Sequence, residues 1–155
     1  MTARRGYGDE TWRLALARDS AALNRAADLL LEGDPGDLDY EGQRARAFAL
    51  AVDGRTDEAL GRLNEGWTDE WPFPAAYAAD IARIRFLVGD YAKALDALQL
   101  SVRGADRLEP AVVELTPECV RREKRLWRRA LRVALSGGTT GQRLGTALAV
   151  LGARL

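Results

Sequence analysis

The sequence predicts an all-α fold, a short array of antiparallel helical hairpins with about seven or eight helices. Two observations carry this prediction. The segment GRTDEAL at Gly54–Leu60 returns 35 residues later as GDYAKAL at Gly89–Leu95. A fixed period of this length, with glycine at the turn, is typical of stacked helical hairpins. Alanine, leucine and arginine also dominate, and aromatic residues make up only 7%. That composition favours helix over sheet.

The first part of the chain contains a weaker copy of the repeat. Residues 1–8 are predicted as a tail, residues 9–18 as a short helix, and residues 20–31 as a second helix that stops at Gly33. Ala26 and Leu30 precede Gly33 at the same spacing at which Ala59 and Leu63 precede Gly66. We therefore expect residues 9–33 to form a degenerate first hairpin, followed by a turn over residues 33–37.

The central residues contain the two best copies. Helices are predicted over residues 39–52 and 56–65, then over residues 75–88 and 90–102. Each pair meets at a glycine, Gly54 or Gly89, which suits the left-handed residue that often follows a helix. The repeats therefore span residues 40–73 and 75–108.

The last hairpin is out of register with the others. Thr116, Pro117 and Glu118 combine a hydroxyl cap, a first-turn proline and an acid, which together predict the start of a helix that reaches Leu135. Two glycines then end it, and Thr139 or Thr140 caps a final helix. Residues 116–155 are thus predicted as a capping hairpin, since terminal repeats are often atypical. The whole array, residues 1–155, is predicted as one domain.

The segment Gly89–Leu95 resembles the turn and second-helix start of a tetratricopeptide repeat. This family has small residues where its helices cross closely, and the chain has them at Ala47, Ala59 and Gly66, then at Ala82, Ala94 and Ser101. The resemblance covers residues 40–108, and more loosely residues 9–33. Gln43 and Ala78 depart from it, because the family has tryptophan there. It implies a right-handed superhelix whose concave groove binds a partner protein or peptide.

The resemblance also implies which residues line that groove. By register they come from the first helix of each repeat: Glu41, Arg44, Phe48, Ala79, Arg83 and Phe86. A lining of arginine and phenylalanine suits an acidic, apolar segment of a partner. The alternative is that the two phenylalanines simply fill the cores of the hairpins. The expected function is that of a non-enzymatic interaction module or adaptor.

Charge is distributed unevenly, although the formal net charge is zero. Residues 1–80 contain 9 basic and 16 acidic side chains, a net charge of −7, and residues 81–155 contain 14 and 7, a net charge of +7. This asymmetry is compatible with head-to-tail self-association into a homo-oligomer, or with two solvated faces.

The strongest charged feature is a predicted basic helix with six arginines: Arg121, Arg122, Arg125, Arg128, Arg129 and Arg132. Three interpretations stay open: a solvated face, a surface for an acidic protein or an anionic membrane, and a nucleic-acid contact. A nucleic-acid-associated regulatory protein is the alternative function. The sequence pI near 6.4 and the lack of a reading motif make it the weaker one.

The chain contains no histidine and one cysteine, Cys119. Histidine-based catalytic pairs and the usual zinc sites are therefore excluded, and Cys119 is interpreted as an inert helix residue. Residues 37–42 look like half a calcium loop, but Phe48 stands where the bidentate glutamate belongs. No phosphate-binding glycine loop has its lysine. We predict no catalytic residue, metal or cofactor.

Two further expectations come from apolar residues. The segment Trp67–Tyr77 holds two of the four tryptophans and is interpreted as a wedge between hairpins, with an exposed recognition loop as the alternative. No apolar stretch reaches the roughly 18 residues that span a bilayer, and the first residues lack the apolar core of a signal peptide. We expect a cytoplasmic protein, and the arginine-rich, lysine-poor composition is typical of bacterial coding.

Overall fold

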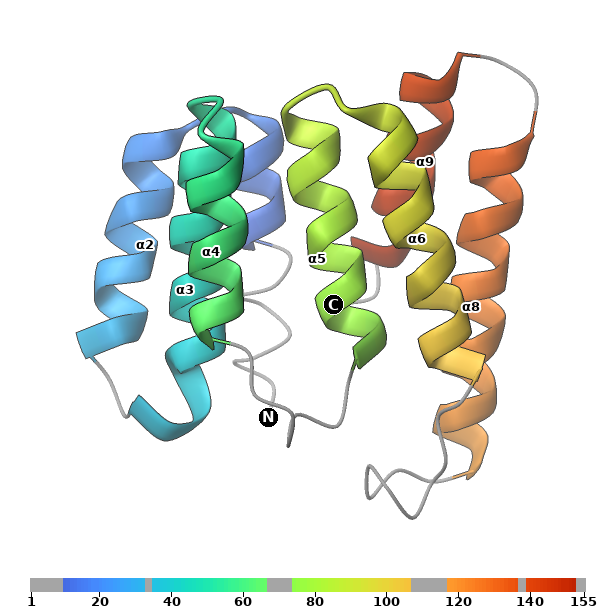
Figure 1. The fold of residues 1–155 in the computed structure, drawn as a ribbon. Coiled ribbons are helices and arrows are strands. Elements are labelled where there is room, and N and C mark those ends of the chain that lie inside the picture. Colours follow the sequence, from blue (N-terminus) through green and yellow to red (C-terminus); the bar gives the residue numbers. More distant parts are fainter. Residues whose placement is uncertain (1–9, 33–34, 67–73, 107–116, 137–138, 153–155) are drawn as a thin grey trace. The chain divides into compact units, whose positions relative to one another are not determined.

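The computed structural model describes residues 10–32, 35–66, 74–106, 117–136 and 139–152 (Figure 1). Over these residues the chain is all-α, as predicted, with no strand. Residues 10–16 are helical. The following helices are α2 (Ser20–Glu32), α3 (Pro35–Val52), α4 (Thr56–Gly66), α5 (Pro74–Leu87), α6 (Tyr91–Asp106), α8 (Pro117–Leu135) and α9 (Thr140–Gly152). None of the described helices is both long and apolar enough to cross a membrane.

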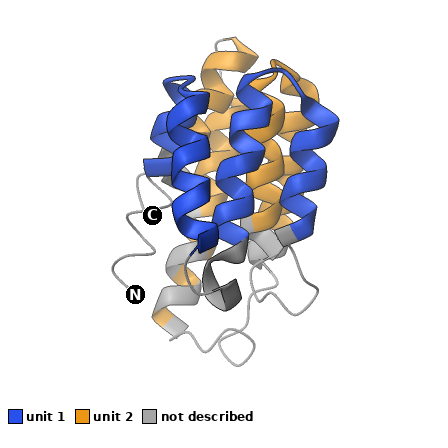
Figure 2. Cartoon of the chain, turned by 90° about the vertical axis from the view of Figure 1, so that its left-hand side faces the viewer, with its two compact units in different colours: residues 1–69, 152–155 blue, residues 70–151 orange. Residues whose placement is uncertain are grey.

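The chain divides into two compact units (Figure 2). Unit 1 is Met1–Asp69 with Gly152–Leu155, and unit 2 is Glu70–Leu151. The hairpins of residues 9–33 and 40–73 thus fall mainly in the first unit, and those of residues 75–108 and 116–155 mainly in the second.

In unit 1, α3 packs against both α2 and α4. The core of the unit combines buried alanines and Phe48 of α3 with buried residues of the two neighbouring helices. These are Leu23, Ala27 and Leu30 of α2, and Ala59 and Leu63 of α4. Trp12 meets Phe48 edge to face, with 5.7 Å between the ring centroids. Gly42 lets the first turns of α3 approach α2, because a Cβ there would stand 2.7 Å from Leu31.

In unit 2, α6 packs against α5 and α8. Helix α9 also approaches the α5–α6 hairpin through two glycines. A Cβ on Gly141 would stand 3.0 Å from the Tyr91 ring, and one on Gly145 would stand 3.3 Å from the Phe86 ring. Gly141 and Gly145 therefore allow α9 to pack closely against the α5–α6 hairpin.

Three hairpins close with the same backbone turn. Arg18, Gly54 and Gly89 have φ angles of 56°, 79° and 81°, in the left-handed region. At Gly54 the N–H donates to the carbonyl three residues back at 3.0 Å, and the next N–H donates to the carbonyl five residues back at 2.9 Å. Bonds of 3.0 and 3.1 Å form the same pattern at Arg18, and bonds of 3.0 and 2.9 Å do so at Gly89. This is the Schellman ending of a helix.

These turns correct the predicted register of the first hairpin. Arg18 and Gly54 are 36 residues apart, so the residue equivalent to Ala59 is Leu23, and the equivalent of Leu63 is Ala27. The prediction that Ala26 and Leu30 match Ala59 and Leu63 was therefore wrong. Burial agrees with the new register, because Leu23 and Ala27 are buried whereas Ala26 is only half-buried.

The start of the third helix was also misplaced. The sequence predicts a turn over residues 33–37 and a helix from residue 39, but α3 begins at Pro35. Proline suits the first turn of a helix, because its missing N–H has no intrahelical partner there in any case. The remaining helix ends lie within a few residues of those predicted.

Candidate functional site

In unit 1, the three predicted groove residues lie together on α3. The Arg44 guanidinium stands 4.7 Å from the centre of the Phe48 ring and 3.7 Å from the Glu41 carboxylate. The Arg44 side chain is only 3% exposed, Phe48 is fully buried and Glu41 is half-buried. Arg44 therefore stacks on Phe48 in a place that offers it little contact with solvent.

In unit 2, two of the three predicted groove residues are buried on α5. Arg83 donates to Asp80 at 2.7 Å, and both side chains are 3% exposed. Ala79 is fully buried beside them. Phe86 is half-buried and meets Tyr91 with 5.7 Å between ring centroids. Within the described residues, the two predicted sets thus belong to different units, and most of their members are core residues.

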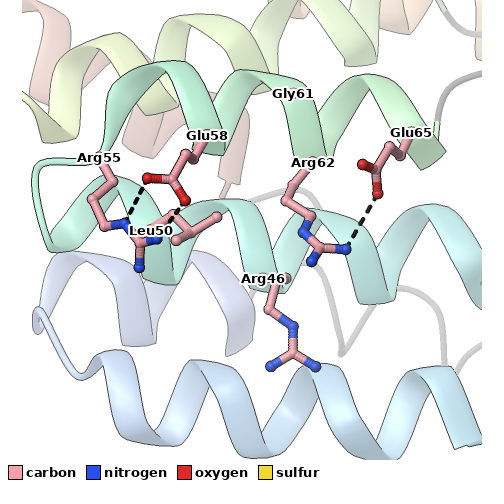
Figure 3. Close-up of a pocket in the computed structure, with 7 residues that line it drawn as sticks. All are labelled: Arg46, Leu50, Arg55, Glu58, Gly61, Arg62 and Glu65. Atoms are coloured by element: carbon pink, nitrogen blue, oxygen red, sulfur yellow. Dashed lines mark hydrogen bonds and ion pairs between the residues drawn. The ribbon is translucent and has the colours of Figure 1, made fainter.

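A surface hollow of about 410 Å³ lies between α3 and α4 of unit 1 (Figure 3). It is lined by two residues of α3, the residue before α4 and four residues of α4: Arg46, Leu50, Arg55, Glu58, Gly61, Arg62 and Glu65. Gly61 leaves its part of the lining without a side chain, and no atom lies within 4 Å of the position where its Cβ would stand. Leu50 supplies the apolar part of the lining.

Ion pairs stand around the hollow and hold its arginines in place. Arg55 donates to both carboxylate oxygens of Glu58, and Arg62 donates to Glu65 at 3.2 Å (Figure 3). Arg46 turns toward α2, where it donates to Asn24 at 3.0 Å and Asp28 at 2.6 Å.

The pairs at the hollow are exposed and therefore exchangeable. Arg55 and Glu58 are both more than half exposed, and so is Glu65. The hydrogen bond and the charge of Arg55 lower the pKa of Glu58, so this carboxylate stays ionised at neutral pH. Exposed pairs of this kind contribute little to stability. A carboxylate of a partner can replace Glu58 or Glu65 at low energetic cost, and the guanidinium forks then hold it in bidentate geometry.

The sequence did not predict this hollow. Its signal is two arginine–glutamate pairs at i, i+3 at the start and end of one helix, with a glycine between them. Nothing in the spacing alone showed that Arg46 of the preceding helix would lie beside them.

The predicted basic helix is α8, and five of its arginines are described and face solvent. Trp127, Ala130 and Ala134 are buried on its other side. The exposed arginines are Arg121, Arg125, Arg128, Arg129 and Arg132. The side chains of Arg122 and Cys119 lie outside the described residues, as do residues 67–73 of the tryptophan segment and the side chains of residues 37–39 in the half calcium loop.

No group of three or more potential metal ligands occurs among the residues that the structure describes. No protein-family model, no curated protein and no solved structure matches the chain.

Proposed function

We propose that the chain is a non-enzymatic interaction module, a short array of tetratricopeptide-like hairpins that binds an acidic segment of a partner protein. The equivalent turns at Arg18, Gly54 and Gly89 support the array, because they recur at 36 and 35 residues with the same hydrogen bonds. Repeated hairpins of this kind act mainly by offering extended surfaces to other proteins.

The observation that carries the proposal is the hollow between α3 and α4. It combines exposed guanidinium groups with an apolar residue, Leu50, and with free space above Gly61, which has no side chain. Such a combination fits a segment with a carboxylate beside an apolar side chain. We assign partner contact to this hollow rather than to Arg44, Phe48 and Arg83, whose side chains are buried.

A substitution that fills the hollow tests the proposal. Gly61→Leu places a side chain in the free space above this residue. Leucine is also more favourable than glycine inside a helix, by up to roughly 1 kcal/mol. Lost binding therefore cannot be attributed to lost folding. Asn64→Leu is the matched control, since it adds the same side chain at an exposed position of the same helix that does not line the hollow.

The measurement is quantitative capture of partners from an extract of the source cells, with each variant as bait. We expect the unaltered chain and Asn64→Leu to retain the same partner, and Gly61→Leu to retain at least fivefold less, about 1 kcal/mol of binding energy. Equal capture by Gly61→Leu, or no specific capture by the unaltered chain, would overturn the proposal.

A further inference from the structure

The exposed arginines of α8 form a single row. With 3.6 residues per turn, Arg121, Arg125, Arg128, Arg129 and Arg132 fall within roughly 100° of the helix circumference and extend along about 16 Å of its axis. The buried residues Trp127, Ala130 and Ala134 lie on the opposite side of the helix. We call these five residues the arginine row.

Four of the five members of the arginine row have no acidic partner among the residues that the structure describes. Arg121, Arg125, Arg129 and Arg132 form no ion pair with any described side chain, Glu118 of the same helix included. Arg13, Arg55 and Arg62, in contrast, each pair with a glutamate three residues away. Within the described part of the chain, four guanidinium forks on one side of α8 thus lack a carboxylate.

We infer that the arginine row is a docking surface for an acidic helix of a partner protein, with carboxylates repeated at i, i+4, i+8 and i+11. This inference rests on the proposed function, because it assumes a protein partner. A second helix laid along α8 has the same 3.6-residue turn, so carboxylates at that spacing face Arg121, Arg125, Arg129 and Arg132 in sequence. The charges are complementary, and the arginine fork matches a carboxylate in bidentate geometry.

The end of the row adds an apolar contact. Leu135 is 54% exposed and lies three residues beyond Arg132, on the same side of α8 as Arg128. An apolar side chain of the partner helix can cover it. This favours a helix, which carries both kinds of group, over a simple polyanion.

Several observations favour a protein over a nucleic acid as the occupant. Trp127, the one aromatic residue of α8, is buried and therefore presents no face on which a base can stack. The sequence pI is near 6.4, whereas nucleic-acid-binding domains are typically strongly basic. The row also occupies only one side of a single helix. Its width therefore matches one partner helix better than the two phosphate backbones of a duplex.

The test uses the full chain and three labelled probes. The first is a capped 15-residue alanine–glutamine peptide with glutamate at positions 1, 5, 9 and 12 and leucine at position 15. The second has the same composition with the glutamates spread around the helix, and the third is a 16-base-pair DNA duplex. Binding is measured by fluorescence anisotropy at about 20 mM salt, where exposed charges are screened least, and then along a salt series.

Two charge-matched double variants separate the row from general attraction. Arg125→Gln with Arg129→Gln removes two members of the row, whereas Arg13→Gln with Arg25→Gln removes two exposed arginines of unit 1. We expect the patterned peptide to bind at least roughly fivefold more tightly than the redistributed one, since several exposed ion pairs then form together. The row variant should lose most of this preference, and the control variant should keep it.

Four results would overturn the inference. One is equal binding of the two peptides, and another is an unchanged preference in the row variant. The third is tighter binding of the DNA duplex that disappears in the row variant, which would assign the row to nucleic acid. None of these three results contradicts the proposed function if Gly61→Leu still reduces partner capture, because the hollow and the row are altered by different variants. Self-association that is lost in the row variant alone would instead identify the occupant as a second copy, and would also overturn it.

Discussion

Asp80 and Arg83 form an ion pair of 2.7 Å one turn apart on α5, with only 3% of each side chain exposed. Water screens such a pair far less than it screens the surface pairs of α4. The two charges neutralise each other where neither would be tolerated alone. The pair therefore makes the packing of α5 depend on both residues at once.

Removing one member of this pair should destabilise the chain strongly. Asp80→Asn leaves the buried Arg83 charge without its carboxylate, and we expect the free energy of unfolding to fall by about 3 kcal/mol. Urea unfolding followed by circular dichroism measures this. Glu65→Gln, which breaks an exposed pair, should change the value by less than about 0.5 kcal/mol. Similar effects of the two substitutions would contradict the burial of the Asp80–Arg83 pair.

The glycine of a hairpin turn and the glycine inside α4 should respond to alanine with opposite signs. No atom lies within 4 Å of the Cβ position at either Gly54 or Gly61, so packing does not enter. Gly54 has a φ of 79°, and Gly54→Ala should destabilise by about 1 kcal/mol because alanine avoids this conformation. Gly61→Ala should stabilise by roughly 0.5–1 kcal/mol, because glycine is unfavourable inside a helix. Thermal unfolding of the two variants side by side checks both signs.

Arg18 occupies the same turn position without being glycine, so its replacement should help. Its φ of 56° places a Cβ in the left-handed region. We expect Arg18→Gly to raise the free energy of unfolding by up to about 1 kcal/mol, whereas Arg18→Val should lower it. A lower stability of Arg18→Gly would mean that contacts of the arginine side chain outweigh the backbone term.

Acid should weaken the Arg55–Glu58 pair in a defined pH range. Arg55 lowers the pKa of Glu58 by its hydrogen bond and its charge. Because the folded pKa lies below the unfolded one, the pair stabilises the fold above the unfolded pKa of glutamate and loses this effect as pH falls through the folded value. A carboxyl titration by NMR should show the Glu58 pKa rising toward its ordinary value in Arg55→Gln. An unchanged pKa would contradict the pair.

The sequence predicted the elements of the fold well where the local signal was strong. Gly54 and Gly89 located two of the three equivalent turns, because glycine is the residue that this conformation favours. The turn at Arg18 gives no such signal, and the spacing of Ala26, Leu30 and Gly33 therefore predicts a wrong register for the first hairpin. Pro35 was interpreted as a turn residue, although proline suits the first turn of a helix equally well.

The surface was harder to predict than the fold. Arg44 and Arg83 each lie in the first helix of a predicted repeat, which the resemblance places along a groove. Both are buried instead, because an acid three residues earlier, Glu41 or Asp80, pairs with each of them. The hollow depends on how far α3 and α4 lie from each other around Gly61, which no spacing along the chain determines. The basic helix was found correctly as a charge pattern, since its exposed side follows directly from the helical period.

The arginine row also strains the helix that carries it. Like charges four residues apart, such as Arg121 with Arg125 and Arg125 with Arg129, repel by a few tenths of a kcal/mol per pair, and Glu118 in the first turn is the one described acid on that side of α8. Dissolved anions screen this repulsion. Amide hydrogen exchange in α8 should therefore slow as salt rises, and a bound partner should slow it further. The charges that we propose to bind a partner thus also make α8 less stable when no partner is bound.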